Sequence, residues 1–207
     1  MITGKAKDCL EIVDGKLLRG DNSKIFRGVS INSRTLQEGE LFVCIQGENF
    51  DGHDFQDEAI KKGAAGIILS DPKNFYKEMM DQKNGPFVIE SRNTLRALQD
   101  LAAYQRTRFP FQVVAVTGTN GKSTTKEMID AIIETKFKTL KTKGNFNNHI
   151  GLPLTLLSRG PEHEVGVLEM GMSAAGEFKR LAEIAKPNIG VITNISAGHL
   201  NQLKSVK

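Results

Sequence analysis

The fold of this chain is decided by the stretch Val113-Val114-Ala115-Val116-Thr117-Gly118-Thr119-Asn120-Gly121-Lys122-Ser123-Thr124-Thr125. A run of apolar, β-branched residues leads into a glycine turn, and the turn opens a segment of helical character. This layout is typical of a phosphate-binding loop, in which backbone N–H groups and a helix N-terminus bind the anion. Lys122 would reach the terminal phosphates, and the hydroxyl of Ser123 would hold Mg²⁺.

The match to the strict phosphate-loop pattern is incomplete. Val116 stands where that pattern has its first glycine, so only the shorter form Gly118-x-x-Gly121-Lys122-Ser123 is present. The alternative is a tight strand-to-helix turn with a solvated lysine. The strand before the turn and the helix after it favour the phosphate loop. We therefore predict that the nucleotide phosphates are bound by Gly118, Thr119, Asn120, Gly121, Lys122, Ser123 and Thr124.

Composition sets limits on the class of protein. The chain has 207 residues, of which 39% are hydrophobic and 25% charged, with a net charge of +4. Basic residues are scattered rather than clustered, so no nucleic-acid groove is predicted. Cys9 and Cys44 show no metal or redox spacing, and Cys44 lies in an apolar run typical of a core. Neither a signal peptide nor an apolar run of membrane length is evident, so we expect a cytoplasmic protein without membrane insertion.

The first half alternates between strand and helix patterns. Strands are predicted over 26–31, 40–45, 66–70 and 86–89, and helices over 54–62 and 91–108. This alternation predicts a small α/β domain over residues 1–109. Pro110 halts the last helix, which makes Phe109-Pro110-Phe111 a plausible domain boundary.

Two polar groups in the first half are candidate binding residues. Ser33-Arg34 ends a strand, and its guanidinium can bind a phosphate or carboxylate; the alternative is a solvated loop arginine. Asp51-Gly52-His53-Asp54 can form a metal or catalytic cluster. The alternative for that run is a turn whose aspartate caps a helix.

The second half predicts a parallel sheet over residues 110–207. Strands are expected over 137–140, 164–168 and 188–194, and helices over 122–135 and 173–186. Met128, Ile129, Ile132 and Ile133 form the expected buried stripe of the first helix. The run 143–153 holds three asparagines and two glycines, so we expect a shaped loop there.

Chemical groups gather at one edge of this predicted sheet. Ligands of parallel sheets sit at the carboxyl ends of the strands, where the phosphate loop, Glu169 and His199 all lie. A carboxylate and an imidazole beside nucleotide phosphates suit Mg²⁺ ions that bridge phosphates to protein. The alternatives are a helix-capping carboxylate for Glu169 and a surface or capping histidine for His199.

Together these segments resemble the Mur ligases, the ATP-dependent amide-bond-forming enzymes of peptidoglycan synthesis. The family's ATP loop looks like residues 116–124. The other matching stretches are Ser33-Arg34 through Phe42 with residues 50–54, residues 144–153, Glu169-Met170-Gly171 with Gly176-Glu177, and Thr193-Asn194-Ile195 through His199-Leu200. Within the family these motifs are most similar to ligases that join D-alanyl-D-alanine to UDP-N-acetylmuramoyl-tripeptide.

The resemblance implies roles for individual residues. Ser33, Arg34, Asp51, Gly52 and His53 would receive the UDP end of the substrate. Asn145, Asn147 and Asn148 would line the junction between muramoyl-peptide and γ-phosphate. Ser123 and Glu169 would hold one Mg²⁺, and His199 would help to hold a second. The catalytic residues would be Lys122, Asn145 and His199, with ATP and Mg²⁺ as cofactors.

The resemblance also implies a reaction and a limit. A peptide carboxylate would form an acyl phosphate with ATP, and the amine of D-alanyl-D-alanine would displace phosphate, in a pathway that serves the cell wall, cell shape and division. Enzymes of this family have three domains and act as monomers by our expectation, whereas this chain ends at Lys207. We therefore expect an inactive fragment that lacks the third domain and the family's carbamylated lysine. The alternatives are a non-catalytic UDP-sugar or nucleotide-binding module, and another Mur or folylpolyglutamate-type ligase.

Overall fold

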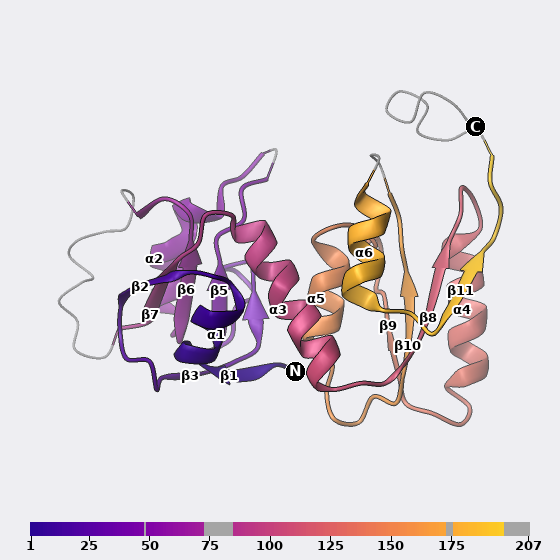
Figure 1. Ribbon diagram of the computed structural model, residues 1–207, viewed down its shortest axis with the longest axis horizontal. Helices are drawn as coiled ribbons and strands as arrows, with labels where there is room; N and C mark the ends of the chain where they lie inside the picture. The colour runs from indigo at the N-terminus through magenta and orange to yellow at the C-terminus, as the bar shows by residue number, and fades with distance from the viewer. Residues whose placement is uncertain (48, 73–84, 173–175, 197–207) are drawn as a thin grey trace. The chain divides into compact units, whose positions relative to one another are not determined.

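The computed structural model describes residues 1–47, 49–72, 85–172 and 176–196. The chain forms two compact units, residues 1–101 and residues 102–207, each an α/β structure with its own sheet (Figure 1). The predicted fold class is confirmed: a small α/β unit precedes a unit whose parallel sheet carries the phosphate loop at the end of β8.

The first unit is built on a five-stranded sheet with the order β2-β7-β6-β5-β4. Neighbours from β4 to β7 pair in parallel, and β2 pairs with β7 in the antiparallel direction. The strands are β2 (Lys16–Arg19), β4 (Val29–Ser30), β5 (Leu41–Val43), β6 (Gly66–Leu69) and β7 (Phe87–Glu90).

The rest of the first unit covers this sheet. A two-stranded antiparallel sheet joins β1 (Thr3–Lys5) to β3 (Ile25–Arg27). The helices are α1 (Ala6–Ile12), the short 3₁₀ helix η1 (Gly52–Phe55), α2 (Gln56–Lys61) and α3 (Thr94–Arg108), the last of which continues into the second unit. The strand predicted over 26–31 is split at Gly28: up to that residue, whose N–H donates to the carbonyl of Ile2, the chain pairs with the β1 side, and after it β4 pairs with β5.

Burial on both faces explains the apolar strands of this unit. All four residues of β6 and all three residues of β5 are buried, as expected for the centre of a parallel sheet covered on each side. One face packs as a core of Leu36, Phe42, Cys44, Ala59, Ala64, Ile67, Leu69 and Val88. Cys44 is fully buried, which confirms its predicted place in the core.

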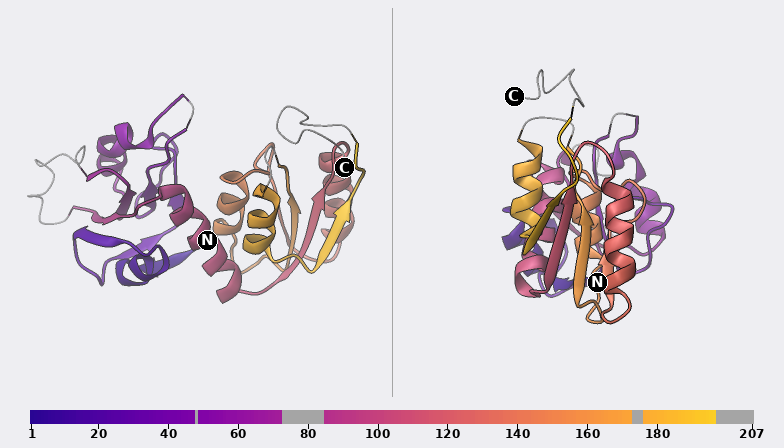
Figure 2. Two further views of the ribbon diagram at one scale, coloured as in Figure 1. Left: turned by 45° about the horizontal axis from the view of Figure 1, so that its top comes forward. Right: turned by 90° about the vertical axis from the view of Figure 1, so that its right-hand side faces the viewer.

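The second unit holds a four-stranded parallel sheet with the order β11-β8-β10-β9. Its strands are β8 (Gln112–Thr117), β9 (Thr139–Lys141), β10 (Val165–Glu169) and β11 (Ile189–Ile192). Its connecting helices are α4 (Lys122–Ile133), α5 (Gly151–Leu157) and α6 (Glu177–Ala185). In the right-hand view of Figure 2, α4 covers one face of this sheet and α6 lies on the other.

The predicted buried stripe of α4 is wrong at two positions. Met128 and Ile132 are 63% and 71% exposed, whereas Lys126 and Asp130 are buried. The polar pair is tolerated because it is fully engaged: Lys126 Nζ donates to the carbonyl of Thr142 (2.8 Å) and pairs with Glu127. The carboxylate of Asp130 accepts from Thr139 (2.6 Å) and Lys141 (2.5 Å). Hydrophobicity alone therefore misplaced Met128 and Ile132, whereas Ile129 and Ile133 are half-buried.

Strand pairing decides which loops meet at the carboxyl edge of this sheet. Glu169 at the end of β10 is in register with Val116, and Ile192 of β11 is in register with Thr117. The phosphate loop after β8 therefore lies between the ends of β10 and β11. Across the described part of the chain, every helix is too short or too polar to cross a lipid bilayer.

Candidate functional site

The phosphate loop runs from the end of β8 to the first turn of α4. Gly118 and Gly121 have backbone φ angles of +133° and +78°, a region that favours glycine. Gly121 is the N-cap of α4, so the N–H groups that follow belong to a first helical turn without intrahelical partners. These donors, with the positive end of the helix dipole, form a site that suits a polyphosphate.

Lys122 lies folded over this loop. Its Nζ donates to the carbonyl oxygens of Gly118 (2.8 Å) and Thr119 (3.0 Å). The ammonium group is therefore held above the concave face of the turn by two weak, neutral acceptors. A phosphate oxygen carries more charge than a carbonyl and is the stronger acceptor for this donor.

The side-chain oxygens of Ser123 and Glu169, both predicted metal ligands, lie together beside the loop. Ser123 Oγ donates to Glu169 Oε2 (2.8 Å), and the Nδ2 of Asn147 donates to Glu169 Oε1 (2.7 Å). Glu169 is 2% exposed, so its carboxylate is held at a fixed place by these two bonds. A hydroxyl with one carboxylate is the sparse oxygen set that Mg²⁺ uses when phosphates and water complete its shell.

This donor set is not a preformed metal cage. Within the described ranges, three or more His, Cys, Asp and Glu residues nowhere gather to hold a metal. Among the described residues, the Glu169 side chain bonds to Ser123 and Asn147 and not to the start of α6, so the helix-capping alternative does not describe it. His199, the other predicted metal ligand, lies outside the described residues.

The asparagine-rich loop differs among its three candidate residues. Asn147 reaches Glu169, and its carbonyl accepts from the N–H of Gly171 (2.8 Å). Asn148 caps α5, because its Oδ1 accepts from the N–H groups of Ile150 and Gly151. Asn145 is exposed and accepts a backbone bond from Asn147. The structure thus brings Asn147 to Glu169, which the sequence predicts as a metal ligand, whereas the Asn148 oxygen accepts from the N–H groups at the start of α5.

Two residues that sequence reasoning did not assign touch the phosphate loop. Thr193 and Asn194 follow β11, and both donate to the carbonyl of Asn120 (2.6 and 3.1 Å). The available signal was their position, since they end a strand at the same sheet edge as Glu169. Position in the sequence did not reveal that β11 pairs with β8 and so lies directly beside the loop.

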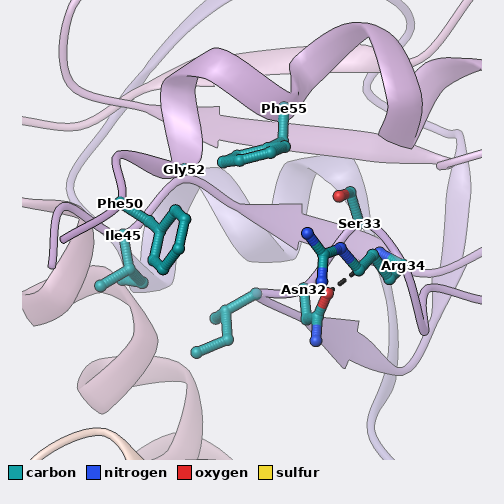
Figure 3. Close-up of a pocket in the computed structure, with 8 residues that line it drawn as sticks. Asn32, Ser33, Arg34, Ile45, Phe50, Gly52 and Phe55 are labelled. Carbon is teal, nitrogen blue, oxygen red and sulfur yellow. Dashed lines mark hydrogen bonds between the residues drawn. The ribbon is translucent and has the colours of Figure 1, made fainter.

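The first unit contains a separate pocket of about 310 Å³. Its walls come from the segment after β4, from the end of β5 and from η1, and the lining residues are Ile31, Asn32, Ser33, Arg34, Ile45, Phe50, Gly52 and Phe55. Figure 3 shows the rings of Phe50 and Phe55 and the guanidinium of Arg34 around the same space. The N–H of Arg34 donates to Asn32 Oδ1 (3.0 Å), which fixes the turn that carries the arginine.

Ser33 lines this pocket but has an internal partner. Its Oγ donates to Glu58 Oε2 (2.7 Å), and this bond, ahead of the nearby Lys62 charge, holds the pKa of Glu58 below its ordinary value. Ser33 therefore anchors the turn to α2. Arg34 remains the cationic group of the pocket wall.

Asp51 and His53 hold the loop that leads into η1. Asp51 Oδ1 accepts from the backbone N–H of His53 (2.9 Å) and from its ring Nδ1 (2.5 Å). Burial opposes ionisation of Asp51, but these bonds outweigh it and lower the pKa of its carboxyl group. This is the helix-capping turn that the sequence left as an alternative. Gly52, between them, is the member of the run that lines the pocket, and a Cβ there would meet the backbone of Cys44 and Ile45.

The ring of His53 contacts Asp51 on one side and Ser70 on the other, and this Asp-His-Ser sequence of contacts resembles a hydrolytic triad. However, Nε2 of His53 accepts a bond from the backbone N–H of Ser70 (3.0 Å), as well as lying 3.2 Å from its hydroxyl. A ring nitrogen engaged by a backbone donor is not free to take a proton from the hydroxyl. The network joins the η1 loop to the end of β6 and has a structural role.

Comparison with known families finds a matching family model for each of the two units. Residues 25–112 match the model described as Mur ligase family, catalytic domain, and residues 116–207 match the Mur ligase middle domain. The two matches meet near the start of β8 and together include both candidate sites.

Individual relatives agree with these matches. The UDP-N-acetylmuramoyl-tripeptide–D-alanyl-D-alanine ligase of Bacillus subtilis is 40% identical over 99% of this chain, and that of Escherichia coli is 35% identical over the whole chain. A crystal structure of MurF from Acinetobacter baumannii covers 100% of the chain with a TM-score of 0.88 and 29% identity. MurF ligase from Thermotoga maritima, solved in complex with ADP, covers 87% with a TM-score of 0.75 and 34% identity. The chain spans 44%, 43%, 44% and 40% of these four proteins, which is less than half of each.

Proposed function

Because this chain belongs to the Mur ligase family, we propose that it forms the substrate-binding and nucleotide-binding portion of a ligase that joins D-alanyl-D-alanine to UDP-N-acetylmuramoyl-tripeptide. Residues 1–109 would receive the UDP-linked substrate, and residues 110–207 would belong to the ATP-binding domain. The observation that carries the proposal is the convergence of the phosphate loop, Ser123, Glu169 and Asn147 at one sheet edge.

The proposed reaction proceeds through an acyl phosphate. The terminal carboxylate of the peptide attacks the γ-phosphorus of ATP, a P–O bond forms, and ADP leaves. The amine of D-alanyl-D-alanine then attacks the acyl carbon and phosphate leaves, with loss of the amine proton. Two anions must approach each other in the first step, so the site must supply positive charge and hydrogen-bond donors.

Lys122 and the first turn of α4 would supply these donors. The Nζ of Lys122 would exchange its bonds to the carbonyls of Gly118 and Thr119 for a bond to a phosphate oxygen. The N–H groups at the start of α4 would bind the phosphates along the helix axis. Asn145, on the exposed side of the asparagine-rich loop, would lie where the peptide carboxylate arrives.

Ser123 and Glu169 would hold Mg²⁺, and His199 would contribute to a second site. When bound, the metal would neutralise charge on the phosphate oxygens. The hydrogen bond between Ser123 Oγ and Glu169 Oε2 (2.8 Å) supports this assignment, because it already places the two oxygens side by side. Asn147 would orient the carboxylate through its second oxygen.

The pocket of the first unit would receive the UDP end of the substrate. Arg34 supplies a cation for the diphosphate, and the rings of Phe50 and Phe55 supply apolar surface for a flat base. Gly52 allows close approach at the pocket floor, while Ser33, Asp51 and His53 hold the surrounding turns.

Calorimetry on the purified 207-residue chain tests this proposal. We expect ATP to bind with Mg²⁺ and the UDP-linked tripeptide to bind independently, each with its own loss-of-binding variant: Lys122→Ala for ATP and Arg34→Ala for the UDP-linked substrate. The two variants serve as controls for each other. If neither ligand binds to the wild-type chain, the proposal is wrong. Phosphate release when D-alanyl-D-alanine is added would contradict the expectation that this chain is inactive by itself and would exclude a non-catalytic binding module.

The site of action follows from the same proposal. UDP-linked precursors and ATP are cytoplasmic metabolites in bacteria, so we place the activity in the cytoplasm. We also propose a monomer, which sedimentation of the purified chain would test. Both statements rest on the ligase assignment.

A further inference from the structure

The two residues that follow β11, Thr193 and Asn194, hold the phosphate loop by hydrogen bonds, and we call this pair the clasp. Thr193 and Asn194 together make hydrogen bonds to loop residues more than 70 positions earlier in the sequence. Both lie in a part of the chain to which sequence reasoning assigned no chemical role. Their role in shaping the nucleotide site rests on the proposed function.

Asn194 pairs with Asn120 in both directions. Its Oδ1 accepts from the backbone N–H of Asn120 (3.1 Å), and its Nδ2 donates to the carbonyl of the same residue (3.1 Å). Its own carbonyl accepts from the N–H of Thr119 (3.0 Å). One asparagine thus satisfies the donor and the acceptor of the residue that precedes Gly121.

Thr193 supports the same loop from the strand side. Its Oγ1 lies 2.6 Å from the carbonyl of Asn120 and 3.2 Å from that of Thr117. The hydroxyl sits so close to Gly118 that a Cβ there would lie 2.2 Å from Oγ1. Gly118 is therefore required by the clasp as well as by its own backbone angle.

The clasp divides the loop's N–H groups into two sets. Those of Thr119 and Asn120 are engaged by Asn194, so they are bound within the protein. The N–H groups at the start of α4 point along the helix axis and have no intrahelical acceptor. Because the Thr119 and Asn120 N–H groups are held in place, the backbone that leads into Gly121 has a fixed direction. The N–H groups at the start of α4 therefore also point in a fixed direction.

We propose that Asn194, supported by Thr193, is a positioning residue for the phosphate loop: it holds the Thr119–Asn120 backbone so that the first turn of α4 is preorganised for a polyphosphate. It acts through the loop and does not itself touch the nucleotide. Preorganised donors bind more tightly because the loop does not have to be ordered when the ligand arrives.

The chain offers a matched control on the same strand pair. At the opposite end of β11, Asn188 makes the equivalent exchange with β8: its Oδ1 accepts from the N–H of Val113 (2.9 Å), and its own N–H donates to the Val113 carbonyl (2.9 Å). Asn188→Leu removes a comparable side-chain bond far from the phosphate loop. It therefore reports the cost of loosening β11 without disturbing the loop directly.

The test compares Asn194→Leu, Asn194→Asp and Asn188→Leu with the wild-type chain by calorimetric titration with inorganic tripolyphosphate and with ATP plus Mg²⁺. We expect Asn194→Leu to weaken both ligands about tenfold, which corresponds to the loss of about one to two hydrogen bonds. Asn194→Asp keeps the acceptor for Asn120 N–H but adds negative charge, so it should also bind more weakly. Asn188→Leu should bind as the wild type does.

A ligand-free measurement separates this inference from the proposed function. Amide hydrogen exchange of Thr119 and Asn120 should be slow in the wild type and in Asn188→Leu, and fast in Asn194→Leu. Equal binding and equal exchange in all three proteins would overturn the positioning role and leave the proposed function standing. Failure of the wild type to bind either ligand would overturn the nucleotide site, and with it the positioning role.

Discussion

The two units build their candidate sites from parts of the chain at very different separations. In the first unit, the turns around the pocket are held by bonds between close neighbours, such as Arg34 to Asn32 and His53 to Asp51, each two residues apart. In the second unit, Ser123 meets Glu169 across 46 residues, and Asn120 meets Asn194 across 74. The first site is mostly local in origin, and the second exists only when its sheet is assembled.

The strands beneath the two sites also differ in burial. β5, which leads to the pocket, is fully buried along its length. β11, which leads to the clasp, is an edge strand whose Ile189 and Ile192 are 58% and 63% exposed. A site that depends on distant segments and an exposed strand should loosen before one that depends on local turns and a buried strand.

The largest expected effect tests whether the units are separate. Phe42→Ala removes a fully buried ring from the first unit and should cost about 3–5 kcal/mol of its stability. Hydrogen exchange followed by mass spectrometry should show loss of protection across residues 1–101, with little change beyond. Leu168→Ala, a buried residue of β10, should produce the reverse pattern. Loss of protection throughout the chain in either variant would show that the units fold as one.

A smaller change tests the long-range origin of the phosphate site. Gly118→Ala places a methyl group against Thr193 at a backbone angle that favours glycine. It should lower the free energy of unfolding by about 3 kcal/mol and should also abolish phosphate binding. The control is Gly144→Ala, which also has a positive φ of +53° but no atom within 4 Å of the added carbon. Urea unfolding and tripolyphosphate titration measure the two effects. Equal results for both variants would mean that backbone strain alone, not the clasp, requires Gly118.

Exchange in the wild-type chain tests the difference in strand burial directly. We expect the amides of β11 to open at a free energy lower than those of β5, by roughly 1–2 kcal/mol, because among the described residues β11 pairs with β8 alone and is largely exposed. Residue-resolved hydrogen exchange by NMR measures both strands in one sample. Equal protection of β5 and β11 would remove the basis for a weaker second site.

The smallest expected effect is the acid sensitivity of the second unit. Hydrogen bonds from Lys126 and Lys141 lower the pKa of Glu127 to about 2, from an ordinary value of 4.5. A carboxyl group whose pKa is lower in the folded state stabilises the fold at any pH above its pKa in the unfolded state. This contribution is lost as the pH falls from about 4.5 to about 2. Because the Glu127 side chain is half exposed, solvent screens the pair and the loss should be well below 1 kcal/mol.

Glu127→Gln checks this pH dependence. The variant should show a flatter stability curve between about pH 4.5 and pH 2, measured by urea unfolding of residues 102–207 at each pH. Glu134→Gln, at the C-cap of the same helix, is the comparison substitution. A curve for Glu127→Gln as steep as that of the wild type would rule out the contribution.

Local patterns in the sequence determined much of the fold. The apolar runs at 40–45, 66–70 and 113–117 predicted strands because a buried parallel strand needs apolar residues on both faces. The glycines and Lys122 predicted the phosphate loop because few other structures require that spacing. The motifs at 33–34, 116–124 and 144–153 also sufficed to indicate the family, which the comparisons confirmed.

Only the tertiary structure decided which residues meet. It placed the polar residues Lys126 and Asp130, instead of Met128 and Ile132, on the buried face of α4. This is possible because partners on β9 and on the loop after it bind their charged groups. It joined Ser33 to Glu58 of α2, and it brought Thr193 and Asn194 to the phosphate loop. Propensity and periodicity describe neighbours along a helix or strand, whereas these contacts depend on strand order, which is set by the free energy of the whole sheet.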